Sequence, residues 1–128
     1  MYCNWGILGP GFIATRAIIP VMHEVSNSRI LAVASSNESR AAEAALRFGI
    51  ERFYSNYQAL LDDPDIDAVY IALPNHLHHE WTIRAAAAEK HVLCEKPLAR
   101  YASECIEMIT ACQRAHVLLL AQNQNHRR

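Results

Sequence analysis

The sequence has no charge bias, no long apolar run and no paired-cysteine motif, and each absence argues against a class of protein. Its 12 lysine and arginine residues nearly balance 13 acidic residues, which gives a net charge of −1. A chain so close to neutral lacks the electrostatic footprint of a protein that binds nucleic acid or an anionic membrane. No apolar run approaches the ~20 residues of a membrane-spanning helix, and the N-terminus lacks the charged-then-apolar pattern of a signal peptide. We therefore expect a cytoplasmic protein with neither a nucleic-acid nor a membrane partner.

The cysteines are few and are not arranged as metal ligands. Cys3, Cys94, Cys105 and Cys112 show no CxxC spacing and lie within apolar patterns. This favours reduced, buried thiols in a cytosolic protein over disulfides or a metal site. The 128 residues, 52% apolar and 20% charged, are typical of one soluble globular domain.

Short apolar runs alternate with helix-like stretches from one end of the chain to the other. Strands are predicted at residues 5–8, 30–34, 52–54, 68–72, 91–94 and 117–121. Helices are predicted at residues 13–23, 40–48, 57–61, 78–88 and 103–115. Continuous apolar strands between helices indicate βαβ units and a parallel sheet covered on both faces. We predict an α/β fold with a doubly wound, six-stranded parallel sheet, the Rossmann arrangement.

Polar residues and one glycine mark the expected helix ends. Ser36 and Asn37 are good N-caps for the helix that Gly49 ends, because their side-chain oxygens accept backbone N–H groups and glycine adopts the left-handed conformation readily. Ser103 is expected to cap the last helix, and Asn75 the helix that follows the fourth strand.

Residues 9–14, with the sequence Gly-Pro-Gly-Phe-Ile-Ala, fit the G-x-G-x-x-G/A pattern between a strand and a helix. Gly9 permits a tight turn and Gly11 lets the backbone approach a pyrophosphate, which the N-terminus of the helix then holds. The alternative is a glycine-rich turn without a ligand. The setting favours dinucleotide binding, with contacts from Gly9, Gly11, Phe12 and Ile13.

The end of the second strand distinguishes NADP from NAD. An NAD site usually places an acidic residue there for the ribose 2′-OH, whereas this chain has Ser35 and Ser36. Ser35, Ser36 and Asn37 can donate hydrogen bonds to a 2′-phosphate, which Arg40 could neutralise. Glu38 is expected in the first turn of the next helix, facing solvent. We predict NADP as the cofactor, with NAD as the alternative in which Arg40 is an ordinary solvated residue.

The loop after the fourth strand holds three histidines near Leu73, Pro74 and Asn75. A metal site is unfavoured, because His76 and His78 would point apart on a helix and no nearby cysteine or acid completes a ligand set. We expect residues 73–75 to line the cofactor cleft, because this strand adjoins the first at the topological switch point. His78 is a candidate contact in the site, and His76 and His79 are expected to be surface residues.

The apolar run at residues 92–94 ends abruptly in Glu95, Lys96 and Pro97. Glutamate and lysine are almost never buried without partners or a task, and the proline prevents a smooth passage into a helix. The ammonium is then fixed at the carboxyl end of a strand, where open α/β sheets bind ligands. The alternative is a surface Lys–Glu pair in a loop.

Together, residues 9–14, residues 73–75 with His78, and residues 94–97 resemble the N-terminal domain of the Gfo/Idh/MocA oxidoreductases. The resemblance covers essentially the whole chain. It implies an NAD(P)-dependent enzyme that transfers hydride to or from a sugar, polyol or related hydroxyl compound.

The resemblance also implies roles for the residues around the Glu-Lys-Pro motif. Lys96 would lie beside the nicotinamide and the substrate hydroxyl as the catalytic residue. Pro97 would follow a cis peptide that orients the lysine. Glu95 would contact the cofactor ribose or fix Lys96, and Gln122 and Asn123 would approach the nicotinamide.

Family members continue into a second α/β domain that carries the other catalytic groups and the oligomer interface. We therefore assign residues 1–122 to the dinucleotide-binding domain and residues 123–128 to the truncated start of the second domain. Little or no turnover by this chain alone is expected, and a dinucleotide-binding module without turnover is the alternative function. An α/β domain that binds no nucleotide is a third. A sheet edge left bare would favour self-association into a homo-oligomer.

Overall fold

A computed structural model describes residues 3–9, 27–95 and 98–122. Several predicted features lie outside these ranges. They are the phosphate loop from Pro10 onward with Gly11, Phe12 and Ile13, the helix expected at 13–23, Lys96, Pro97 and Asn123.

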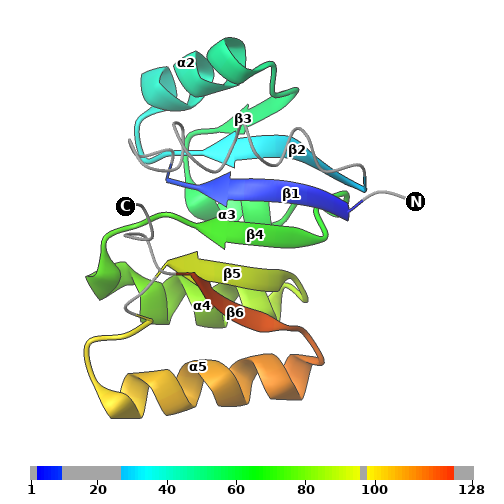
Figure 1. Ribbon diagram of the computed structural model, residues 1–128. Coiled ribbons are helices and arrows are strands. Elements are labelled where there is room, and N and C mark those ends of the chain that lie inside the picture. The colour runs from blue at the N-terminus through cyan, green and yellow to red at the C-terminus, as the bar shows by residue number, and fades with distance from the viewer. Residues whose placement is uncertain (1–2, 10–26, 96–97, 123–128) are drawn as a thin grey trace.

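Six parallel strands form one sheet (Figure 1). They are β1 (Cys3–Leu8), β2 (Ser28–Ala34), β3 (Arg52–Tyr54), β4 (Ala68–Ile71), β5 (His91–Glu95) and β6 (Leu119–Gln122). The strand order is β3-β2-β1-β4-β5-β6. Because β1 lies between β2 and β4, the order reverses there, and this reversal is the topological switch point of a doubly wound sheet. The predicted fold class is confirmed.

Helices follow most of the strands, at or near the predicted positions. The described ones are α2 (Glu38–Phe48), α3 (Tyr57–Leu61), the 3₁₀ turn η2 (Asn75–Leu77), α4 (His78–Ala87) and α5 (Ala102–Ala115). None of these helices is long and apolar enough to cross a bilayer.

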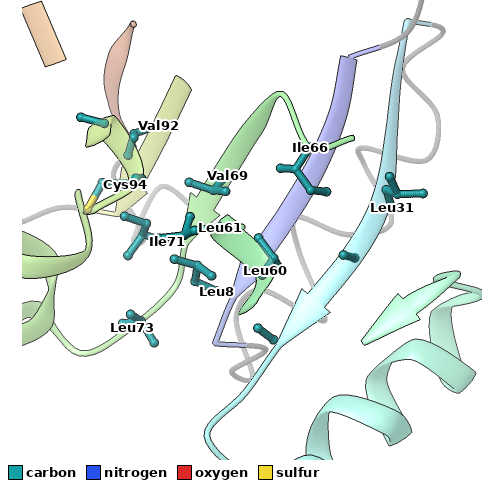
Figure 2. Packing of buried hydrophobic residues seen from close by; sticks show 14 of the residues in the cluster. Leu8, Leu31, Leu60, Leu61, Ile66, Val69, Ile71, Leu73, Val92 and Cys94 are labelled. Carbon is teal, nitrogen blue, oxygen red and sulfur yellow. The ribbon is translucent and has the colours of Figure 1, made fainter. Parts of the chain in front are cut away.

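The core has two parts, one on each face of the sheet. Alternate residues of a strand point to opposite faces, so Leu8 packs in the larger cluster with helices α3, α4 and α5, whereas Ile7 packs in the second cluster with α2. Figure 2 shows the larger cluster, in which Leu60 and Leu61 of α3 lie beside side chains of β1 and β4. Burial of both faces explains why the strands read as continuous apolar runs.

The helix ends correct two predictions from the sequence. The Asn37 Oδ1 accepts the Arg40 N–H at 3.1 Å, and Gly49 ends α2 at φ 66°, as predicted. Ser103 is not the N-cap of α5, because the helix already begins at Ala102, with Tyr101 as N-cap. Asn75 caps no helix either; it opens the 3₁₀ turn, and Leu77 precedes α4 without a side-chain cap.

The thiols are partly as predicted. All four cysteines are free, and Cys94 and Cys112 are buried. Cys3 and Cys105 are only half-buried, because Cys3 begins β1 and Cys105 lies on the partly exposed first half of α5.

A polar network ties together the amino ends of the strands. The Arg52 guanidinium donates to both oxygens of Asp63 at 3.0 and 2.8 Å, and the Tyr54 hydroxyl donates to Asp63 Oδ2 at 2.7 Å. Burial raises the pKa of Asp63, but these hydrogen bonds outweigh it and hold the pKa below its usual value. The buried Lys90 ammonium donates to the carbonyl oxygens of Asp63 and Ile66 at 2.9 and 2.7 Å. The polar groups of this network are therefore paired with one another within the chain.

Candidate dinucleotide site

A pocket of about 150 Å³ lies at the switch point, at the carboxyl ends of the strands. We call it the switch-point pocket. Its lining is Gly9, Ser35, Ser36, Arg40, Tyr57, Ala72, Leu73 and Pro74. The loops after β1, β2 and β4 meet here because the carboxyl ends of parallel strands share one edge of the sheet. The structure thus brings together residues that the sequence predicts for the cofactor site.

Gly9 occupies a position that no other residue fits without strain. Its φ is 80°, and a Cβ there would lie 2.6 Å from Leu73 Cδ2 and 3.1 Å from the Ala72 carbonyl oxygen. Its N–H donates to the Ala34 carbonyl at 2.9 Å, which ties the turn to the end of β2. The absence of a side chain therefore permits the tight turn after β1 against the loop that follows β4.

Donor groups line the side of the pocket at the end of β2. Ser35 is buried, its N–H donates to the Tyr54 carbonyl at 3.1 Å, and its Oγ accepts the Asn37 N–H at 3.1 Å. Ser36 and Arg40 are exposed, and in the described part of the chain their side chains have no hydrogen-bond or ion-pair partner. The Ser36 hydroxyl and the Arg40 guanidinium are therefore free to bind an anion such as a ribose phosphate.

Tyr57 is a member of the pocket that the sequence did not predict. Its ring packs edge-on against Trp81, with centroids 5.2 Å apart and planes at 78°. The Asn56 side chain caps α3 by accepting the Ala59 N–H at 2.8 Å, so Tyr57 is the first residue of that helix. The position of Tyr57 in the sequence did carry a signal for this role, because a helix that starts just after β3 begins near the end of the neighbouring strand β2.

The loop after β4 is held in place by a hydrogen bond with the buried His78. This histidine is 2% exposed, and its Nε2 lies 2.7 Å from the Leu73 carbonyl oxygen, to which the N–H form donates. The contact fixes the loop whose Leu73 and Pro74 line the pocket, while Asn75 is exposed. A direct contact between His78 and a ligand stays a prediction.

The other two histidines near this loop, His76 and His79, lie nearer the surface than His78. His76 is exposed, and His79 Nε2 lies 2.7 Å from Glu107 Oε1 on α5. Within residues 3–9, 27–95 and 98–122, no group of three or more His, Cys, Asp and Glu side chains is placed to hold a metal ion.

The carboxyl end of β5 carries a buried acid. Glu95 is 6% exposed and accepts a hydrogen bond of 2.6 Å from the hydroxyl of Tyr70, which is 1% exposed. Burial, and then the hydrogen bond to Glu95, raise the pKa of Tyr70, so the phenol stays a donor. Glu95 pairs in register with Gln122 of β6, so these two predicted residues lie side by side at the edge where ligands bind.

A glycine turn, a donor-lined pocket at the switch point and polar groups at the neighbouring strand ends define a dinucleotide-binding Rossmann domain. Residues 3–123 match the family model GFO_IDH_MocA, described as "Oxidoreductase family, NAD-binding Rossmann fold". The chain belongs to the Gfo/Idh/MocA family of oxidoreductases.

Individual relatives share about half or fewer of the aligned residues. An uncharacterized oxidoreductase of Rhizobium meliloti is 51% identical over 83% of this chain and 32% of its own length. D-xylose 1-dehydrogenase (NADP(+)) 2 of Haloferax volcanii is 43% identical over 91% of this chain and 35% of its own. The crystal structure of the 3-ketoreductase KijD10 from Actinomadura kijaniata with NADP and TDP-benzene aligns with a TM-score of 0.91 and 35% identity, over 95% of this chain and 37% of that one. The chain spans about a third of the length of these relatives.

Proposed function

We propose that this chain binds NADP(H) at the carboxyl edge of its sheet and forms the cofactor half of an oxidoreductase. The reaction is hydride transfer between NADP(H) and a hydroxyl or carbonyl carbon of a sugar, polyol or related compound. The observation that carries the proposal is the switch-point pocket, lined by Gly9, two serines and an arginine whose side chain has no partner among the described residues. Relatives named as an NADP-dependent xylose dehydrogenase and a 3-ketoreductase crystallised with NADP support the cofactor and the substrate class.

The lining of the pocket favours NADP over NAD. An NAD site usually has a carboxylate for the ribose 2′-OH, and no acid is among the described residues that line this pocket. Glu38 lies in the first turn of α2 and is exposed. Ser35, Ser36 and Arg40 present hydroxyl and guanidinium donors instead, which suit a phosphate dianion.

Each part of the cofactor has proposed partners along the same edge. Gly9, with Gly11, Phe12 and Ile13, would hold the pyrophosphate at the glycine turn. The loop at residues 73–75, positioned by His78, would line one side of the site for the adenosine half of the cofactor. Glu95, Lys96, Pro97, Gln122 and Asn123 would surround the nicotinamide half.

The division of labour follows from these positions. The dinucleotide supplies the hydride chemistry when it is bound. The chain orients it, and the Lys96 ammonium would donate a hydrogen bond to the substrate oxygen and stabilise charge that develops there. Binding by the described residues and turnover are separable, so a dinucleotide-binding module without turnover of its own is the second candidate. The observation that favours it is that Ser35, Ser36 and Arg40, which line the switch-point pocket, are hydrogen-bond donors suited to hold a phosphate rather than to react with a substrate.

Titration of NADPH and NADH by fluorescence against wild type and Arg40→Ala tests the proposal. We expect wild type to bind NADPH about tenfold more tightly, because a hydrogen bond to a charged group contributes about 1.5–3 kcal/mol and 1.4 kcal/mol is tenfold. Arg40→Ala should lose most of this preference while NADH affinity stays within about twofold.

The matched control is Arg47→Ala, in the last turn of the same helix. Its guanidinium lies 5.5 Å from the centre of the Phe48 ring and outside the pocket, so the preference should survive. Preference of wild type for NADH, or an unchanged preference in Arg40→Ala, would contradict the proposal.

A further inference from the structure

Tyr70 is the largest fully buried side chain of the described core, and it ends in a polar group. It lies on β4 in the second core cluster, among the side chains of Ile7, Val33 and Ala44. A buried hydroxyl without a partner costs ~1–3 kcal/mol. The Tyr70 hydroxyl avoids this cost by donating a hydrogen bond of 2.6 Å to Glu95 Oε2.

The register of the sheet explains how the two side chains meet. Tyr70 pairs with Leu93 of β5, and Glu95 lies two residues further along the same strand. Paired residues of neighbouring strands point to the same face of the sheet, and so do residues two apart in one strand. Leu93 and therefore Glu95 project to the same face as Tyr70. The hydroxyl crosses from the middle of β4 to the last residue of β5.

The contact fixes the end of β5 more strongly than backbone pairing alone. A carboxylate at 6% exposure needs a donor, and the phenol is the side-chain donor recorded for it among the described residues. A short O–H···O⁻ bond of this kind is about twice as strong as a neutral one. Glu95 is thereby held against Tyr70 at the point where β5 meets the ligand edge, and Lys96 is the next residue in the sequence.

We propose that Tyr70 is a positioning residue for the nicotinamide half of the site, acting through its hydrogen bond to Glu95. The inference rests on the proposed function. It assigns Glu95 to fixing the strand end rather than to a free contact with the ribose. It also separates the site into two halves, because Tyr70 is not among the residues that line the switch-point pocket.

Two ligands distinguish the halves. NADPH carries the nicotinamide, whereas 2′-phospho-ADP-ribose carries the same adenosine, pyrophosphate and 2′-phosphate without it. We expect Tyr70→Phe to bind NADPH about tenfold more weakly and 2′-phospho-ADP-ribose within about twofold of wild type. The blue shift and enhancement of bound NADPH fluorescence should also decrease, since they report the surroundings of the nicotinamide.

The chain offers a matched control. Tyr54, the last residue of β3, also donates its hydroxyl to a buried carboxylate, at 2.7 Å, but its acceptor Asp63 precedes β4 and belongs to the polar network of the amino ends. Tyr54→Phe removes a bond of the same kind and should leave both affinities within about twofold. Thermal melts of all variants confirm that each is folded.

Variants of Glu95 keep the inference testable if Tyr70→Phe does not fold. The amide oxygen of Glu95→Gln still accepts the Tyr70 hydroxyl, so NADPH affinity should fall by no more than about threefold. Glu95→Ala leaves the hydroxyl unpaired and should lose about tenfold.

The outcomes separate the two proposals. Equal losses of both ligands in Tyr70→Phe, or no loss of NADPH affinity in folded protein, would overturn the positioning role. A loss in Glu95→Gln as large as in Glu95→Ala would do so too, because it indicates a direct contact of the carboxylate with the ribose. Wild type that binds neither ligand would overturn the proposed function itself.

Discussion

Among the described residues, polar groups at the amino ends of the strands are paired with other groups of the chain, whereas at the carboxyl ends several polar groups line a pocket. Asn4 shows the first pattern: its side chain accepts from Arg29 Nε at 2.8 Å and donates to the Asp65 carbonyl at 2.9 Å. Ser36 and Arg40 show the second, since neither side chain has a partner among the described residues.

The difference separates stability from binding in one sheet. Groups at the amino ends that are paired within the chain contribute mainly by holding the strands together. Unpaired donors at the carboxyl ends contribute little to folding and keep their hydrogen-bonding capacity for an anion. Substitutions at the two ends should therefore affect different measurements.

The largest effect is expected from Gly9→Ala, which changes the carboxyl end. A Cβ at φ 80° would lie 2.6 Å from Leu73 Cδ2 and 3.1 Å from the Ala72 carbonyl oxygen, so the turn must move. We expect about a hundredfold loss of NADPH affinity, because small displacements of a ligand cradle cost about that much. Fluorescence titration measures it.

Gly49→Ala is the control for backbone strain alone. Gly49 has φ 66°, a Cβ added there would have nothing within 4 Å, and the residue ends α2 far from the glycine turn in sequence. The substitution should lower the free energy of unfolding by about 1–2 kcal/mol without changing NADPH affinity. Equal binding losses in the two glycine variants would show that general strain, not the cradle, governs affinity.

Lys90→Met tests the opposite end. It keeps the apolar stem but removes the ammonium that donates to the Asp63 and Ile66 carbonyls. We expect the free energy of unfolding to fall by about 2–3 kcal/mol, since two buried carbonyls lose a charged donor. NADPH affinity, measured at a temperature where the variant is folded, should stay within about twofold. If Lys90→Met had normal stability but impaired NADPH binding, the amino ends would also contribute to binding, and the proposed difference between the two ends would be wrong.

The smallest effect is expected at the edge of the sheet. Leu118 and Leu120, before and within the edge strand β6, are 62% and 56% exposed. We expect the chain to self-associate weakly at high concentration, and Leu120→Lys to reduce this, because a charge on an edge strand opposes pairing between copies. Leu46→Lys, at an 86% exposed leucine on α2, should not. Sedimentation velocity decides, and a strictly monomeric wild type would contradict the expectation.

Local signals in the sequence were sufficient for most of the fold. Residues 52–54 and 57–61 have the predicted bounds because turn residues flank them closely. The predicted caps at Ser103 and Asn75 were wrong, because one helix starts before its serine and a 3₁₀ turn intervenes before the other.

The candidate site was only partly predictable. Gly9, Ser35 and Arg40 stood out because they follow β1 and β2, at the strand ends and helix start where a dinucleotide site is expected. The pairing of Tyr70 with Glu95 depends on the register between β4 and β5, which no local pattern specifies. The place of Tyr57 in the pocket likewise needs the neighbour relation of β2 and β3.

Amide chemical-shift mapping of the ¹⁵N-labelled chain during titration with NADPH tests most directly whether the carboxyl edge of the sheet is the binding site. We predict saturable shifts at Gly9, Ser35 and Ser36, with Asn4 and Lys90 at the amino ends unmoved. Shifts that are absent at saturating NADPH, or that centre on the amino ends of the strands, would contradict this.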